Sequence, residues 1–244
     1  MPVYGRLAED QLPHASPIPS PLYPPPPWEL KEARLLKLVF ETSEDAVLDW
    51  IPPKLTRSTP PYATIIVASY PDSPVGPCNV ATQYVGCRAG FFIRAYVLQS
   101  IVDSFEAAAA MREVWGLPCR LGEVEVRRSD GAVSARVSRN GALLADVSLK
   151  DGHAIDTSSA RFDAVLTVRT TPSIEEGKRH DLLQLVQIDP DYEIAECLRG
   201  TGAVEYGPDS DTDPWDRVPM LNMIAATDCL VNTELPLARY VMPY

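Results

Sequence analysis

Residues 123–141 read EVEVRRSDGAVSARVSRNG, and this stretch decides the fold class. Glutamate and valine alternate at its start, as in a strand with one face in water and the other packed. The dipeptides Asp130-Gly131 and Asn140-Gly141 follow, and they supply the positive φ angles of tight hairpin turns. The alternation of the strand between them is imperfect, so its register stays open. The stretch predicts consecutive antiparallel strands.

Further strand-length apolar runs lie on both sides of this stretch. They occupy residues 35–40, 62–70, much of 79–99, 164–170, 182–188 and 218–231, the last of which could be partly helical. Helical signals are fewer. Ser43 begins a short helix that must end before Pro52, and the alanines at 107–110 favour a helix over 103–114. We therefore expect a mainly β (α+β) fold in which an antiparallel sheet folds on itself.

The region from Pro13 to Pro27 is rich in proline and should be extended. It could serve as a ligand arm for SH3- or WW-type domains. The alternative that we favour is a strap across the domain, anchored by Leu22, Tyr23 and Trp28. We accordingly divide the chain into a strap at residues 1–30 and one domain at 31–244.

Composition excludes several classes of function. The 244 residues carry 22 basic and 33 acidic side chains, a net charge of −11, which disfavours nucleic acid and anionic membranes as partners. No apolar run is long enough for a membrane span, and no secretory signal begins the sequence. Five cysteines without a Cys-x-x-Cys pair and three scattered histidines give no support for a disulfide framework or a metal site. We expect a cytoplasmic protein without a cofactor.

Residues 112–122, REVWGLPCRLG, carry a resemblance to a known family. They are similar to the signature of acetoacetate decarboxylases, in which an Arg-Glu helix end leads into a Gly-x-Pro-Lys-Lys segment. Segments near residues 16–34, 43–53 and 213–235 resemble the family in the same order. The resemblance implies a single antiparallel β-barrel with short helices and an internal pocket, in a homo-oligomer.

The sequence departs from the family at its catalytic positions. In the family, the first lysine forms a Schiff base with a ketone, and the second lysine lowers the pKa of the first. Acetoacetate decarboxylase is the standard example of a lysine activated by a cationic neighbour. The matching positions here are Cys119 and Arg120, and neither side chain can form an imine. The two pocket glutamates match Ile65 and Val80. The resemblance retains only the pocket arginine, as Arg34.

Four residues are therefore candidates for catalysis. Arg34 could bind a carboxylate or enol oxygen, and Arg120 could stabilise an oxyanion, although either could be a surface cation. Cys119 could be a nucleophile beside Arg120, or a small buried apolar group. Tyr84 could exchange a proton with an enolate, or belong to an aromatic core.

Substrate contacts are expected from the neighbouring positions. We assign these to Trp115 and Leu117 at the helix end and to Phe92 and Arg94 on the long strand-like stretch. Trp115 could instead only pack the helix end, and Phe92 could belong to the core.

Three functions are compatible with these residues. The first is an enzyme of secondary metabolism that cyclises, isomerises or dehydrates a ketone, enol or polyene without Schiff-base chemistry, as a lyase or isomerase. The second is a non-catalytic binder of a small molecule, or a scaffold. The third is decarboxylation of a β-keto acid by a route without an imine.

Overall fold

Strands form where β-branched and aromatic residues are dense. The structure is a computed structural model that describes residues 2–244, and β3 (Tyr62–Tyr70) has the bounds that the sequence predicts. The stretch 79–99 instead divides into β4 (Cys78–Ala89) and β5 (Phe92–Val102). The turn between them uses Gly90, whose φ of 61° is readily adopted by glycine.

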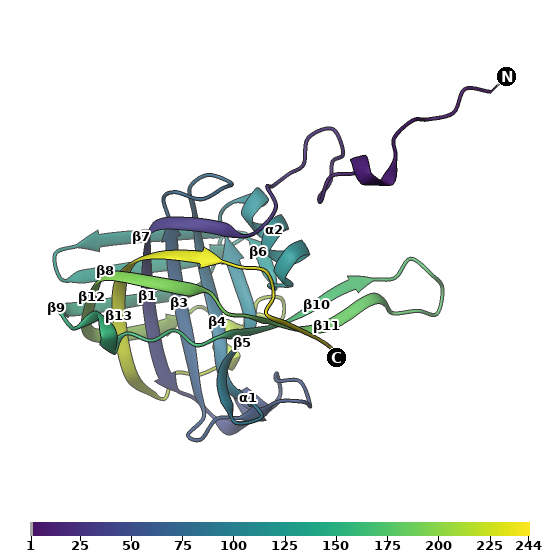
Figure 1. Ribbon diagram of the computed structural model, residues 1–244. Helices are drawn as coiled ribbons and strands as arrows, with labels where there is room; N and C mark the ends of the chain where they lie inside the picture. The colour runs from purple at the N-terminus through teal and green to yellow at the C-terminus, as the bar shows by residue number, and fades with distance from the viewer. Residues whose placement is uncertain (1) are drawn as a thin grey trace.

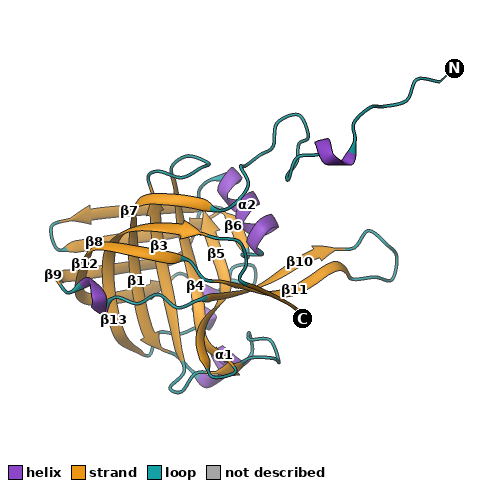
Figure 2. Ribbon diagram, viewed as in Figure 1, coloured by secondary structure: helices purple, strands orange, loops and turns teal. Residues whose placement is uncertain are grey.

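The remaining elements are mostly strands (Figure 1, Figure 2). The other strands are β1 (Trp28–Glu41), β2 (Thr56–Arg57), β6 (Cys119–Leu121), β7 (Glu123–Ser129), β8 (Ala132–Arg139), β9 (Ala142–Ala154), β10 (Val165–Pro172), β11 (His180–Ile188), β12 (Asp191–Tyr206), β13 (Asn222–Leu235) and β14 (Tyr240–Pro243). The helices are α1 (Glu44–Leu48), α2 (Phe105–Trp115) and the 3-10 turns η1 (Glu9–Gln11), η2 (Thr157–Ser159) and η3 (Trp215–Arg217). No described helix is long and apolar enough to span a membrane.

All the strands belong to one 14-stranded sheet, in the order β14-β11-β10-β5-β4-β3-β1-β13-β12-β9-β8-β7, with β2 beside β4 and β6 beside β5. The expected closed antiparallel barrel is wrong in two respects. Within residues 2–244, the end strands β14 and β7 do not pair, so the sheet stays open. Strand β5 also pairs in parallel with β10 and with β6; for β6, helix α2 carries the chain back before the strand begins.

The sheet curls so that its strands bury side chains on both faces. One face holds the largest core, in which Leu36, Leu38 and Phe40 of β1 pack with Val137 of β8 and Leu149 of β9. We call it the first face. The second face of β1, β3, β4 and β5 is covered by helix α2 and the segment 155–164. The two faces therefore provide separate environments for polar side chains.

Helix α2 begins and ends at well-defined caps. The Ser104 hydroxyl accepts a hydrogen bond from the Ala107 amide at 3.3 Å, as an N-cap does. Gly116 ends the helix with φ of 71°. These caps fix where the chain turns from the helix into β6, which carries Cys119.

The second half of the proline-rich arm docks on helix α2. The Tyr23 hydroxyl donates a hydrogen bond to Glu113 at 2.5 Å, and the Trp28 ring packs edge-on against Trp115 with centroids 5.2 Å apart. Tyr23 and Trp28 are buried and Leu22 is half-buried. Residues 2–12, which precede the arm, are exposed and run away from the body (Figure 1). Strand β1 begins at Trp28, so a division at residue 30 would fall within this strand. The division of the chain into a strap and one domain stays a prediction.

We predict that Gly116→Ala destabilises the protein much more than Gly141→Ala. Both glycines have positive φ, 71° and 78°, so alanine at either position should cost about 1–2 kcal/mol. A Cβ at Gly116 would also lie 2.6 Å from Cα of Arg169, whereas nothing lies within 4 Å at Gly141. Urea unfolding of both variants measures the difference. Equal free energies of unfolding would contradict this account of the turn.

Candidate functional site

A cavity of about 80 Å³ lies on the second face, between helix α2 and strands β1, β3, β4, β5, β12 and β13. Its volume corresponds to about two or three water molecules. The wall consists of apolar side chains and hydroxyls: Leu30, Tyr70, Val80, Thr82, Tyr84, Ser100, Met111, Leu117, Val165, Ile188, Pro190, Tyr192, Thr233 and Leu235. None of these fourteen side chains carries a charge at neutral pH.

Three tyrosines give this cavity its chemical character. Burial raises the pKa of Tyr84 to about 12, although a hydrogen bond with Thr82 opposes the shift. Burial and the neighbouring phenols also raise the pKa of Tyr70 and of Tyr192 above the ordinary value. All three phenols are therefore protonated at neutral pH and can donate hydrogen bonds into the cavity.

Two further hydroxyls belong to the cavity wall, and a thiol lies next to them. The hydroxyls of Thr82 and Ser100 are buried and 3.0 Å apart. Cys119 lies beside Ser100 in the parallel pairing of β5 and β6, and it is 1% exposed. Burial raises the pKa of the Cys119 thiol to about 12, with Ser100 and Arg112 opposing in part. Cys119 is thus an uncharged thiol next to the cavity.

An open groove of about 560 Å³ adjoins the cavity, because Leu30, Tyr192 and Thr233 line both spaces. The charged side chains of the groove are mostly acidic: Glu29, Lys31, Asp191, Glu193 and Glu234. The single lysine pairs with Glu29 at 3.3 Å. A ligand approaching along this groove meets a negative potential.

Arg34 does not reach this cavity. Its guanidinium lies on the first face, 3.2 Å from Glu196 and 3.9 Å from the buried Asp228, which Arg128 also contacts. The neighbouring residue Ala33 is the one that packs on the second face. Adjacent residues of a strand point to opposite faces, so Arg34 and Cys119 share no enclosed space.

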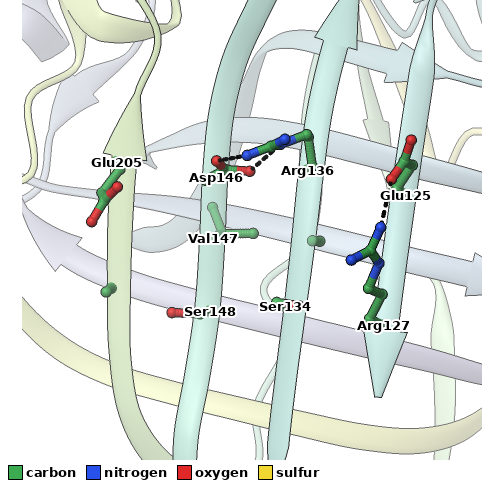
Figure 3. A pocket seen from close by; sticks show the side chains of 10 residues that line it. Glu125, Arg127, Ser134, Arg136, Asp146, Val147, Ser148 and Glu205 are labelled. Carbon is green, nitrogen blue, oxygen red and sulfur yellow. Dashed lines mark hydrogen bonds and ion pairs between the residues drawn. The ribbon is translucent and has the colours of Figure 1, made fainter. Parts of the chain in front are cut away.

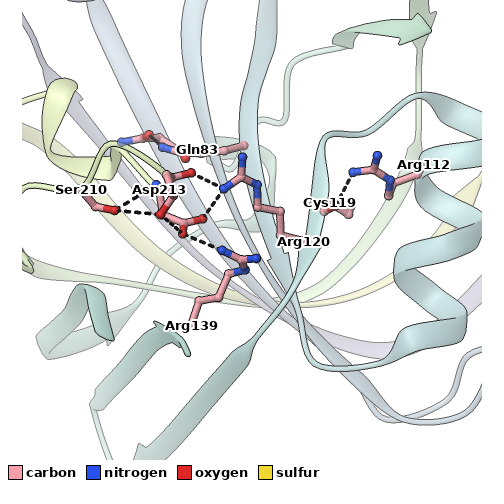
Figure 4. Close-up of polar contacts among 9 residues, drawn as sticks. Gln83, Arg112, Cys119, Arg120, Arg139, Ser210 and Asp213 are labelled. Carbon is pink, nitrogen blue, oxygen red and sulfur yellow. Dashed lines mark hydrogen bonds and ion pairs between the residues drawn. The ribbon is translucent and has the colours of Figure 1, made fainter. Parts of the chain in front are cut away.

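Arg120 also points away from Cys119, because the two are adjacent residues of strand β6 (Figure 4). Its guanidinium pairs with Asp213 at 2.9 Å and also donates to the Thr212 carbonyl, while Arg139 pairs with Asp213 at 2.9 Å. Burial alone would raise the pKa of the Asp213 carboxyl, but hydrogen bonds from Arg139, Thr212 and Arg120 hold it below its ordinary value. This arginine pair holds the loop before η3.

Of the predicted substrate contacts, only Leu117 lines the cavity. Trp115 is fully buried against Trp28 and donates a hydrogen bond to the Pro236 carbonyl at 2.7 Å. Phe92 is 65% exposed near the β4–β5 turn, and its ring lies 5.1 Å from the Arg94 guanidinium. Arg94 also donates to Gln187 at 3.1 Å. The roles assigned to Trp115, Phe92 and Arg94 stay predictions.

Sequence reasoning missed most of the polar wall. Tyr70 is the last residue of the predicted strand 62–70, and a polar aromatic residue at a strand end could have been named as a candidate site residue. Thr82 and Tyr84 share one face by their spacing of two, which alternation could have shown. Tyr192 and Thr233 carry no local signal, because they come together only when β12 pairs with β13.

Another groove, of about 320 Å³, lies on the outward side of β7, β8, β9 and β12 (Figure 3). Most of its charges are paired, since Arg136 lies 2.7 Å from Asp146 and Arg127 lies 3.5 Å from Glu125, and Glu205 adds a further negative charge. Within residues 2–244, no group of three His, Cys, Asp or Glu side chains is placed to hold a metal ion. The uncharged cavity is therefore the candidate site.

A sequence model of the acetoacetate decarboxylase family matches residues 12–244. This chain belongs to that family. The match begins immediately before the proline-rich arm and continues to residue 244.

Curated and solved proteins that resemble this chain match nearly its whole length. Decarboxylase DEC1 of Cochliobolus heterostrophus is 24% identical over 244 residues, covering 93% of each chain. The fold is similar to that of an acetoacetate decarboxylase with a TM-score of 0.90, at 17% identity and covering 98% and 99% of the two chains. The acetoacetate decarboxylase of Legionella pneumophila gives a TM-score of 0.85 at 16% identity, covering 97% of each chain. The enduracididine biosynthesis enzyme MppR, complexed with pyruvate, gives 0.81 at 16% identity, covering 94% of this chain and 97% of that one.

The lysines of this family member lie away from the cavity wall. Of the five lysines, none is among the cavity-lining residues described above. Lys37 is the most enclosed, with Nζ donating to the Arg161 carbonyl at 2.5 Å and lying 5.1 Å from the Phe162 ring centre. Burial lowers the pKa of this amine. The cavity therefore has hydroxyls and a neighbouring thiol, but no amine on its wall.

We predict that Cys119 in the folded protein reacts very slowly with iodoacetamide. With a pKa of about 12, about one thiol in ten thousand is ionised at pH 8, and the thiolate is the reactive form. Peptide mass spectrometry after timed labelling measures the rate at Cys119. The urea-unfolded protein is the control, in which all five cysteines should label quickly. Fast labelling of folded Cys119 would contradict its assignment as a neutral thiol.

Proposed function

We propose that this protein is an enzyme that binds the carbonyl or enol oxygen of a small metabolite through tyrosine hydroxyls. It then cyclises, isomerises or dehydrates that metabolite without a covalent intermediate. The observation that carries this proposal is the placement of Tyr70, Tyr84 and Tyr192 around one uncharged cavity. The proposal gives the tyrosine phenols the catalytic role that the family resemblance would give to a lysine.

Neutral phenols suit a reaction that develops negative charge on oxygen. A fixed hydrogen-bond donor in a site of low polarity stabilises an enolate more than a ketone, and so lowers the barrier. Because burial keeps the phenols protonated, Tyr84 can also deliver a proton to a leaving hydroxyl or a developing carbanion. Dehydration and enol isomerisation both need such a donor.

The wall argues against an imine route. An imine needs an amine, and the side chain beside the cavity at the family's lysine position is the Cys119 thiol. The neutral state of this thiol also disfavours a thioester or thiohemiacetal intermediate. Binding and orientation by shape and hydrogen bonds remain as the sources of rate enhancement.

The two adjoining spaces suggest how a substrate would lie. The cavity of about 80 Å³ accommodates only the reacting end, and the groove of about 560 Å³ would hold the remainder. Tyr192 and Thr233, which line both, would contact the bond between the two parts. The complex of MppR with pyruvate supports carbonyl binding in this fold. A binder without catalysis would use the same contacts.

Decarboxylation is the second candidate, because the relative DEC1 is named a decarboxylase. Loss of carbon dioxide from a β-keto acid gives an enolate, which the same phenols would stabilise. The substrate, however, is an anion, and no cation lines the cavity to pair with its carboxylate. The acidic groove further disfavours it.

We predict that Tyr84→Phe lowers kcat/KM by about 100-fold for any small enol or β-hydroxyketone that the protein converts, since one oxyanion donor is worth about that much. Diacetone alcohol and acetylacetone are suitable probes, followed by absorbance of the enone or enol. Tyr240→Phe, at a tyrosine that is 51% exposed, is the matched control and should retain activity. Full activity of Tyr84→Phe would contradict the proposal.

Sodium borohydride supplies a second test of the same mechanism. Added with acetylacetone, it should leave the protein mass unchanged, because no imine forms. A reduced adduct on a lysine such as Lys37 would mean that an amine reaches the substrate after all.

We predict that methyl acetoacetate binds at least about tenfold more tightly than acetoacetate at neutral pH, since the ester lacks the charge that the groove repels. Calorimetric titration measures both affinities. Raising the salt from about 0.1 M to about 1 M should narrow the difference by screening the groove carboxylates. Tighter binding of acetoacetate would favour decarboxylation instead.

A further inference from the structure

Two buried cysteines face each other on neighbouring strands. Cys197 of β12 and Cys229 of β13 are directly opposite in the antiparallel register, and their sulfur atoms are 2.6 Å apart. Both are free thiols, 2% and 0% exposed. Two unbonded sulfur atoms do not normally lie this close, so the backbone already holds the pair near bonding distance.

The strand geometry suits a disulfide. Opposed residues of an antiparallel pair have Cα atoms about 4.5–5.5 Å apart, which lies within the range that a disulfide spans. The other cysteines lack such a partner. Among the described residues, the sulfur contact of Cys119 is to Met111 at 3.9 Å, and Cys87 is paired with the Arg94 carbonyl.

We propose that Cys197 and Cys229 form an intramolecular disulfide when the protein meets a low-molecular-weight disulfide such as glutathione disulfide. One thiol, as its thiolate, attacks glutathione disulfide and releases one glutathione. The second thiol then attacks the mixed disulfide and releases another. The two protein thiols are oxidised by two electrons, glutathione disulfide is reduced, and both thiol protons end on the two glutathiones.

The pair lies on the strands that form part of the cavity wall. Tyr192 and Thr233 are opposed on β12 and β13, as are the cysteines, and an irregularity in the register at Ile194 and Glu196 separates the two pairs. A cross-link at the cysteines would hold β12 against β13 on one side of that irregularity. Oxidation would thus restrain the wall that carries Tyr192.

A loop segment controls access to these thiols. The segment 155–164 covers this part of the second face: the Ile155 amide donates to the Cys197 carbonyl at 3.0 Å, and Phe162 stacks on Tyr192 with centroids 4.4 Å apart. Lys37 also holds this segment through the Arg161 carbonyl. Burial further raises the pKa of Cys229. Exchange in the folded protein should therefore be slow and should need this segment to open.

The experiment oxidises the full-length chain in two ways. In one arm, folded protein is incubated with glutathione disulfide. In the other, protein unfolded in urea with dithiothreitol is desalted and refolded with glutathione disulfide, so that burial does not limit access. Non-reducing digestion and mass spectrometry then map the linked peptides.

We expect a peptide pair joined through Cys197 and Cys229, two hydrogens lighter than the sum of its parts, in most of the refolded protein and more slowly in the folded protein. The oxidised form should unfold at a higher urea concentration than the reduced form, because a cross-link restricts the unfolded chain. Cys197→Ser should abolish the link, while Cys87→Ser, at an equally buried thiol in another cluster, should retain it.

The refolding arm decides the proposal. Stable glutathione adducts at Cys197 or Cys229, links to other cysteines, or links between two chains would each overturn it. Because mapping uses the unmodified chain, the result does not depend on the folding of a variant, and it does not depend on the proposed function.

Discussion

Adjacent side chains of a strand point to opposite faces of the sheet, and this constraint sorts every candidate group in the molecule. On β6, it turns Cys119 towards helix α2 and Arg120 towards Asp213. On β1, it buries Ala33 against the second face and leaves Arg34 beside Asp228. The charged candidates Arg34 and Arg120 thereby point away from the cavity, and the hydroxyls remain around it.

The separation of charge from the cavity determines its chemistry. A cationic side chain would favour an anionic ligand and lower the pKa of nearby phenols, whereas here burial raises the pKa of Tyr84 to about 12. The cavity therefore offers proton donors without a strong base. The proposed reaction would depend on hydrogen bonds that strengthen as charge moves onto oxygen, and water would weaken them.

The cavity wall depends on contacts made far from it. Helix α2 supplies Met111 to the wall, and Leu117 follows the helix cap at Gly116. The proline-rich arm holds the outer side of this helix through the Tyr23–Glu113 hydrogen bond and the Trp28–Trp115 packing. Loss of Tyr23 or Trp28 would therefore change the cavity wall indirectly, because both residues hold helix α2 in place.

The sequence by itself determined the β-rich fold, the two hairpins at Asp130-Gly131 and Asn140-Gly141, helix α2 and the family, because hydrophobic period, turn residues and a signature segment are local. Of the residues that it predicted for the site, Leu117 and Tyr84 line the cavity and Cys119 lies beside it, while their roles stay predictions. It could not assign Arg34 to a face, since an alignment shifted by one residue exchanges Arg34 with Ala33. Only the tertiary structure decided that the sheet stays open and that Tyr70, Tyr84 and Tyr192 meet, because β12 is joined to β3 and β4 through the pairing of β1 with β13, whose residues lie far apart in the chain.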